Sequence, residues 1–194
     1  MTQSRHDIID RSDSRWLRLR DQIQQDSLKR GEFKLSSGRT SHFIFQLRQT
    51  TLHPEGAALL ADMIVDYMRA NDIKHVGGMV QGAVPIAAAV AARSYGTQNP
   101  VFAFFVRKET KEHGAKERID GFIGDEGDEI LIVDDVATSG GSLIKTLEAL
   151  REEGHSRVVR KALIIIDREE GAAEALSEHG VELVSIFKKS DFDI

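Results

Sequence analysis

The sequence contains no cysteine, and this absence excludes both a disulfide framework and a zinc site built from thiolates. It also lacks any apolar run approaching the roughly 20 residues that span a bilayer. The stretch MTQSRHDIIDRSDSRW (1–16) is charged and has no continuous apolar segment, which argues against a secretory signal or a membrane anchor. We therefore expect a cytoplasmic protein that does not bind membranes.

The usual nucleotide-binding signatures are missing as well. There is neither a P-loop lysine motif nor a GxGxxG motif, so a nucleoside triphosphatase or a dinucleotide-dependent enzyme fits poorly. The net charge of −5 argues against general nucleic-acid binding. Against that acidic background, residues 107–118 hold five basic and three acidic side chains. This local excess of positive charge suits a small, highly anionic ligand, although a solvated charged face is the usual explanation of such a cluster.

The apolar pattern predicts an α/β fold with a mainly parallel central sheet flanked by helices. Near-continuous apolar strands alternate with helical segments, as in sheets that are covered on both faces. Strands are expected at 73–78, 101–106, 129–134, 161–167 and 182–187, helices at 15–30, 54–71, 82–96, 141–154 and 171–180, and extended chain around a Ser-Ser-Gly turn within 33–48. Residues 107–128 form a long, charged connection, and loops of that length are usually functional lids or disordered.

The stretch VDDVATSGGS (133–142) carries the clearest chemistry. Two adjacent acids, Asp134 and Asp135, end an apolar strand, and small residues and hydroxyls follow before a helix begins. Ionised carboxylates accept hydrogen bonds from vicinal hydroxyls such as those of ribose, and backbone N–H groups at a helix N-terminus bind phosphate. The stretch therefore predicts a cradle for a sugar phosphate. The alternative is a capped, tight strand-to-helix turn that binds nothing.

Several stretches resemble known enzymes. ILIVDDVATSGGS (130–142) resembles the signature of the type I phosphoribosyltransferases, which bind 5-phosphoribosyl-1-pyrophosphate (PRPP). VRKETKEHG (106–114), followed by RIDG (118–121), resembles the mobile catalytic loop of the orotate phosphoribosyltransferases, a family with that fold. Further matches, in family order, are LSSGRTS (35–41), LHPEGAALLADMI (52–64), GGMVQGAVPIAAAVA (77–91) and DREEGAAEAL (167–176).

The resemblance implies a single domain over 1–194 with the type I phosphoribosyltransferase fold. It places an N-terminal helix and a small hood in 1–52, the core in 53–194 and the mobile loop at about 107–121. The implied reaction transfers the 5-phosphoribosyl group of PRPP to orotate, giving orotidine 5'-monophosphate and pyrophosphate in de novo pyrimidine (UMP) biosynthesis. The resemblance also implies Mg²⁺ bound through PRPP without direct protein ligands, and a homodimer whose loop reaches the neighbouring subunit's site.

The same resemblance assigns site residues. The implied PRPP contacts are Arg107, Lys108, Lys111, His113, Asp134, Asp135, Val136, Ala137, Thr138, Ser139, Gly140, Gly141 and Ser142. Lys111 and His113 are the candidate catalytic residues, for stabilising transition-state charge or transferring a proton. Thr138 and Arg168 are the candidate orotate contacts, since a guanidinium suits a planar carboxylate.

Two positions depart from the family pattern. Many relatives carry lysine where this chain has Ser36 and Gln81, and both positions usually lie near PRPP. The loss of two cations puts the strength of pyrophosphate binding in doubt unless other groups compensate.

Other interpretations stay open. The PRPP cradle alone also fits transferases of purine bases or uracil, and some proteins of this fold sense PRPP and regulate transcription. An intact loop, and the lack of a convincing helix-turn-helix in 1–30, favour an enzyme. The alternative to an orotate contact for Arg168 is a surface ion pair with Glu169 or Glu170. Phe43 and Phe45 are candidates to border the base, although aromatics that alternate along a strand are more often core residues.

Overall fold

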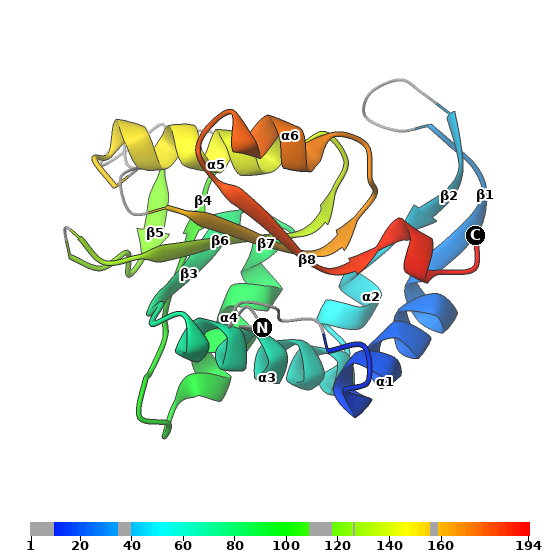
Figure 1. The fold of residues 1–194 in the computed structure, drawn as a ribbon, viewed down its shortest axis with the longest axis horizontal. Helices are drawn as coiled ribbons and strands as arrows, with labels where there is room; N and C mark the ends of the chain where they lie inside the picture. The colour runs from blue at the N-terminus through cyan, green and yellow to red at the C-terminus, as the bar shows by residue number, and fades with distance from the viewer. Residues whose placement is uncertain (1–9, 35–39, 109–117, 126, 156–158) are drawn as a thin grey trace, which may run out of the picture.

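The computed structural model describes residues 10–34, 40–108, 118–125, 127–155 and 159–194, which form two sheets flanked by helices (Figure 1). The main sheet has six strands in the order β5-β4-β3-β6-β7-β8. Their bounds are His75–Met79 (β3), Phe102–Val106 (β4), Ile119–Gly121 (β5), Ile130–Ala137 (β6), Lys161–Asp167 (β7) and Glu182–Lys188 (β8). All neighbours are parallel except β5, which is antiparallel to β4. The predicted α/β fold with a mainly parallel central sheet is confirmed.

Helices cover both faces of this sheet. Figure 1 shows α5 (Gly141–Glu152) and α6 (Ala172–Ser177) above it, and α3 (Pro54–Ala70) and α4 (Ala83–Ser94) below it. Strand β6 shows why both faces are covered, because its side chains alternate between two apolar clusters, one on each face. Leu131 and Val133 pack in the cluster that contains α3 and α4, whereas Ile130 and Ile132 pack in the cluster that contains α5 and α6. Two-sided burial explains why these strands read as continuous apolar runs.

The N-terminal portion differs from the sequence prediction. The helix expected over 15–30 is shorter, because α1 (Ser14–Gln22) continues as a π-helical turn over Ile23–Ser27 and strand β1 (Leu28–Lys34) follows. Strand β1 pairs antiparallel with β2 (Thr40–Phe45), and we call this pair the hood strands. Backbone pairing with a distant segment therefore overrides the helical pattern after Ser27. The predicted Ser-Ser-Gly turn lies outside the described residues.

Two short elements were not predicted. A single helical turn, α2 (Arg48–Thr51), follows the hood strands, and β5 follows the long charged connection. Within the predicted loop at about 107–121, residues 119–121 are thus a strand, and the pairing of Val106 with Ile119 brings the two ends of the connection together.

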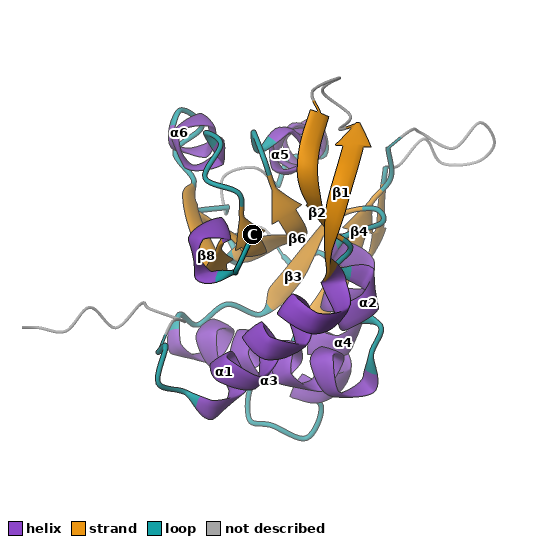
Figure 2. Ribbon diagram, turned by 90° about the vertical axis from the view of Figure 1, so that its right-hand side faces the viewer, coloured by secondary structure: helices purple, strands orange, loops and turns teal. Residues whose placement is uncertain are grey.

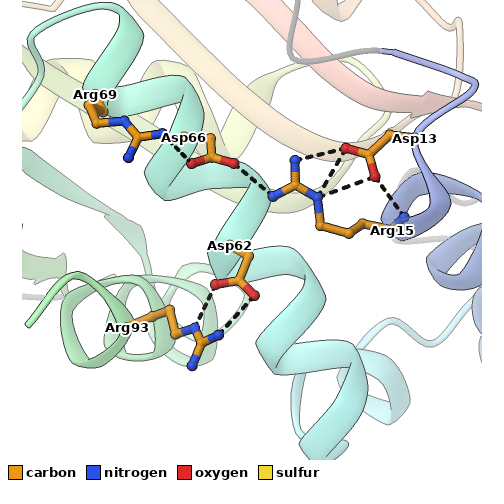
Figure 3. A network of polar contacts seen from close by, with 6 residues as sticks. All are labelled: Asp13, Arg15, Asp62, Asp66, Arg69 and Arg93. Atoms are coloured by element: carbon orange, nitrogen blue, oxygen red, sulfur yellow. Dashed lines mark hydrogen bonds and ion pairs between the residues drawn. The ribbon is translucent and has the colours of Figure 1, made fainter. Parts of the chain in front are cut away.

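Ion pairs fix the N-terminal helix against the core (Figure 3). Arg15 of α1 binds Asp13 at the start of its own helix and reaches Asp66 of α3 at 2.7 Å. Trp16 is 4% exposed, and its indole N–H donates to the carbonyl of Ile186 at 3.0 Å. The other contacts of this network join α3 to itself through Asp66 and Arg69, and α3 to α4 through Asp62 and Arg93.

The hood strands stand beside the main sheet, with α1, α3 and α4 gathered below (Figure 2). The C-terminal segment lies against them, since the carbonyl of Asp193 accepts hydrogen bonds from Gln24 and Arg30. Among the described residues, no helix is both long and apolar enough to cross a membrane.

Candidate active site

The predicted site residues lie where the central parallel strands end. Strands β3, β4, β6 and β7 run in the same direction and end at Met79, Val106, Ala137 and Asp167. Their carboxyl ends therefore share one edge of the sheet, which is where open α/β sheets bind ligands. The segments that follow these strands begin with Val80, Arg107, Thr138 and Arg168, so four stretches distant in sequence meet at one edge.

Asp134 and Asp135 form a close pair of carboxylates at the end of β6. Asp134 is 7% exposed and Asp135 is partly buried. The backbone N–H of Asp135 donates to Asp134 Oδ1 at 2.9 Å, and that of Val136 donates to Asp135 Oδ1 at 2.8 Å. Burial, followed by the charge of Asp135, raises the pKa of the Asp134 carboxyl to about 7. Hydroxyl donors from a ligand would favour its ionised form.

This raised pKa predicts how stability depends on pH. The ordinary pKa of the Asp134 carboxyl is 3.8, so from about pH 4 to about pH 7 the folded protein binds more protons than the unfolded chain. The free energy of unfolding therefore falls as pH rises through that window. Asp134→Asn removes this titration, and we expect it to raise the melting temperature by several degrees at about pH 8 but hardly at about pH 4.

Thermal melts of the wild type and this variant across that pH range check the prediction. Asp72→Asn, at an exposed acid before β3, is the matched control and should keep the wild-type pH dependence. An equal shift of the Asp134→Asn variant at both ends of the range would contradict the assignment.

Gly82 packs directly against the carboxylates of Asp134 and Asp135. It precedes α4, and a Cβ placed on it would lie 2.2 Å from Asp134 Oδ1 and 2.8 Å from Asp135 Oδ1. No side chain can occupy that space unless the carboxylates move. The N-terminus of α4 thus lies against the acids.

The loop after β6 lies where the sequence predicts the cradle. Gly140 has φ 79°, a left-handed conformation that favours glycine, and the helix α5 begins at the next residue. A cavity of about 370 Å³ lies over this turn. It is lined by Asp134, Val136, Ala137, Thr138, Ser139, Gly140, Gly141, Ser142, Leu143 and Lys145. The structure thus brings eight of the predicted PRPP contacts together, and Asp135 borders the same region beside Gly82.

Arg168 lies in a second, adjoining cavity of about 500 Å³. Its backbone N–H donates to the carbonyl of Ala137 at 3.0 Å, so a residue that lines the second cavity is hydrogen-bonded to one that lines the first. The Arg168 side chain is 8% exposed, its Nε donates to Glu170 Oε1 at 2.9 Å, and its guanidinium carbon lies 4.8 Å from the ring centre of Phe43. Of the two alternative partners, Arg168 pairs with Glu170, and the pair is partly buried.

The basic residues of the charged connection are placed only in part. Arg107 follows β4 and forms an ion pair with Asp120 on β5, and Lys108 is exposed. Neither residue lines the cavity at the end of β6. The candidate catalytic residues Lys111 and His113 lie outside the described residues, as does Ser36.

Gly82, Lys145 and Ser41 escaped the sequence prediction, and Glu170 was considered only as a surface partner of Arg168. Gly82 and Lys145 border the first cavity, and Ser41 and Glu170 line the second. The helical spacing from Gly141 to Lys145 could have indicated that the lysine shares a face with the loop. Gly82 and Ser41 depend on contacts between distant segments, for which one sequence carries no signal.

Comparison with known proteins agrees with this geometry. Residues 48–187 match the model of the phosphoribosyl transferase domain. An orotate phosphoribosyltransferase of Rhodopseudomonas palustris (strain BisB5) is 48% identical over 178 residues, which cover 90% of this chain and 94% of the relative. The orotate phosphoribosyltransferase of Mycobacterium tuberculosis H37Rv superposes with a TM-score of 0.79 at 30% identity, covering 93% of this chain and 99% of that one.

A second crystal structure of the Mycobacterium tuberculosis enzyme, in complex with PRPP, has a TM-score of 0.73 and 29% identity, and covers 91% of this chain and 98% of the other. The chain matches these enzymes over nearly its whole length. It also has an acidic pair and a glycine turn at the carboxyl end of β6, beside a buried arginine. This chain therefore belongs to the phosphoribosyl transferase domain family, among its orotate phosphoribosyltransferases.

Proposed function

We propose that the protein transfers the 5-phosphoribosyl group of PRPP to orotate, giving orotidine 5'-monophosphate and pyrophosphate in de novo pyrimidine biosynthesis. The observation that carries this proposal is the adjacency of the two cavities. One has acids and a helix N-terminus suited to a ribose phosphate, and the other has a buried guanidinium suited to a carboxylate. The backbone hydrogen bond from Arg168 to Ala137 sets these two sites side by side.

The acidic pair and the loop hold the sugar phosphate in this proposal. Asp134 and Asp135 accept hydrogen bonds from the ribose hydroxyls, and the backbone and hydroxyls of 138–142 bind the 5'-phosphate. The loop is suited to this role because α5 has 12 residues and begins at Gly141. Its first N–H groups and its dipole favour an anion there.

The base occupies the cavity that contains Arg168. The guanidinium binds the orotate carboxylate, with Thr138 as a second contact between the two cavities. Phe43 lines the same cavity and stacks on the guanidinium, so it fixes the cation as well as bordering the base. This arrangement sets N1 of orotate toward C1 of the ribose, where the bond to pyrophosphate breaks and the bond to nitrogen forms.

The cations of the charged connection act on the leaving group. Breaking the bond at C1 builds negative charge on the departing pyrophosphate, and positioned cations stabilise that charge most effectively. We assign Arg107, Lys108, Lys111 and His113 to this task, with Lys111 and His113 as the residues that stabilise the transition state or take the N1 proton. The paired ends of β4 and β5 hold Arg107 and Lys108 at the sheet edge.

Mg²⁺ fits this donor set. Asp134 and Asp135 offer hard oxygen atoms beside the proposed sugar site, which suits magnesium that is bound through PRPP. Magnesium carried on the diphosphate and ribose oxygens would supply positive charge to the leaving group, while this chain's residues orient the sugar. Within the described part of the chain, no cluster of three acidic or histidine side chains suits a metal ion by itself.

The assembly and location are also proposals. A homodimer whose charged connection, residues 107–121, reaches the neighbouring site would combine the cations of one subunit with the acids of the other. We place this dimer in the cytoplasm, with PRPP and orotate as its ligands and without nucleic acid or membrane.

Turnover with different bases tests this function. The protein is incubated with PRPP, Mg²⁺ and orotate, uracil or a purine in turn, and the ultraviolet absorbance is followed. We expect turnover with orotate only, and we expect Arg168→Ala to raise the KM for orotate by about a hundredfold, the effect of losing a charge-assisted pair of hydrogen bonds. Preference for a purine would overturn the substrate, and PRPP binding without turnover would favour a regulator.

A further inference from the structure

The Arg168 guanidinium is held by three groups of the protein. Nε donates to Glu170 Oε1 at 2.9 Å, Nη2 donates to Ser41 Oγ at 3.4 Å, and the ring of Phe43 stacks on its face. Ser41 is oriented for this contact, because its own hydroxyl donates to the carbonyl of Phe43 at 2.7 Å, and its oxygen accepts from the backbone N–H of Phe43 at 3.4 Å as well as from Arg168. Thus both the segment after β7 and the hood strand β2 determine where the guanidinium lies.

We infer that Glu170 is a positioning residue for orotate recognition, which fixes the Arg168 guanidinium so that its remaining N–H groups receive the carboxylate of the base. This inference rests on the proposed contact between Arg168 and orotate. Arg168 and Glu170 share the cavity of about 500 Å³ with Ser41 and Phe43, so the pair lies inside the proposed base site and not behind it.

The geometry of the guanidinium determines which of its N–H groups bind the protein and which remain for the base. Glu170 occupies Nε and Ser41 takes one proton of Nη2. Within the described part of the chain, no acceptor is recorded for Nη1. Nη1 and the second proton of Nη2 form the planar fork that binds a carboxylate through two parallel hydrogen bonds. Glu170 therefore engages the edge of the guanidinium that the base does not need.

Two physical effects make this arrangement useful. An arginine side chain loses rotamer entropy when it is fixed, and Glu170 imposes that cost during folding and not during substrate binding. The buried Nε of Arg168 also needs a hydrogen-bond acceptor, and Glu170 Oε1 provides it. The same carboxylate carries negative charge close to the arriving orotate, so its hydrogen bond to Nε, and not its charge, is the useful part. This distinction can be tested.

Steady-state kinetics of Glu170 variants separate the effect of the hydrogen bond to Arg168 Nε from the effect of the negative charge. Glu170→Ala removes the bond to Nε, and we expect the KM for orotate to rise about tenfold, while the KM for PRPP changes by less than about twofold. Glu170→Gln keeps an oxygen that can accept the same bond, so its KM for orotate should stay within about threefold of the wild type. Glu170→Asp keeps the charge but withdraws it by one methylene, and should resemble alanine. If Glu170→Ala does not fold, Glu170→Asp takes its place in the experiment.

The matched control is Glu169→Gln. Glu169 is the exposed neighbouring acid, and its carboxylate accepts from the backbone N–H of Ser190 rather than from Arg168. This variant loses the same charge one residue away, and should leave both KM values unchanged. Unchanged orotate KM in Glu170→Ala, an equal rise of both KM values, or a Glu170→Gln variant as impaired as alanine would overturn the inference.

A double-mutant cycle separates this inference from the function on which it rests. If Glu170 acts through Arg168, adding Glu170→Ala to Arg168→Ala should change the orotate KM by less than about twofold. A further tenfold rise in the double variant would show an independent role and overturn the inference alone. If Arg168→Ala itself leaves the orotate KM unchanged, the proposed base contact fails first, and the inference fails with it.

Discussion

Gly82→Ala is expected to lower kcat/KM for PRPP by at least about a hundredfold, the loss that follows when reacting groups are displaced by about 1 Å. The added Cβ would lie within 2.8 Å of a carboxylate oxygen of each of Asp134 and Asp135. The acids must move, because the other side of the clash is the backbone at the start of α4. Their displacement removes the acceptors that the ribose hydroxyls need. The KM for orotate should change much less.

Gly96→Ala is the matched control for this variant. A Cβ on Gly96 would meet no atom within 4 Å, although its φ of +83° strains any L residue. We expect a stability loss of about 1 kcal/mol and unchanged kinetics. Measuring kcat, both KM values and the melting temperature for the two variants separates loss of the site from loss of the fold. A Gly82→Ala enzyme with wild-type kinetics would show that the acids do not hold the sugar.

Lys111→Ala is expected to lower kcat by about a hundredfold to a thousandfold, the usual effect of removing one group that stabilises transition-state charge. The resemblance assigns Lys111 to the departing pyrophosphate, whereas it assigns no role to Lys116 of the same charged connection. Lys116→Ala therefore removes an equal charge from the same connection and should cost less than about threefold.

Single-turnover measurements with PRPP and orotate check this pair of variants, because they follow the chemical step without product release. Circular dichroism of both proteins should match the wild type. Equal losses in the two variants would mean that the connection contributes only its overall positive field, and no loss in either would mean that the leaving group is stabilised elsewhere.

Much of the core could be predicted from the sequence because its signals are local. The apolar stripe after Pro54 predicted α3, and continuous apolar runs predicted β6 and β7 with their two buried faces. Asp134 and Asp135 were found because two acids at the end of such a run have no structural use. Their neighbours in the loop followed from glycines and hydroxyls that precede a helix.

The remainder depends on contacts between distant segments. Helical spacing continues through Ile23, but β1 forms because Leu28 pairs with Phe45 across the hood. Strand β5 has three residues and lies at the edge of the sheet, so it has too little apolar pattern to be recognised. The choice of Glu170 over Glu169 as the partner of Arg168 is likewise a matter of backbone direction after β7.

The central claim is that the edge around Asp134 and the following loop hold PRPP. A crystal structure of the protein with PRPP and Mg²⁺ tests it most directly. We expect the 5'-phosphate within hydrogen-bond distance, about 2.7–3.2 Å, of backbone N–H groups of residues 138–142, and the ribose hydroxyls equally close to Asp134 and Asp135. Density for PRPP outside this cavity, with the two carboxylates free of the sugar, would contradict the account.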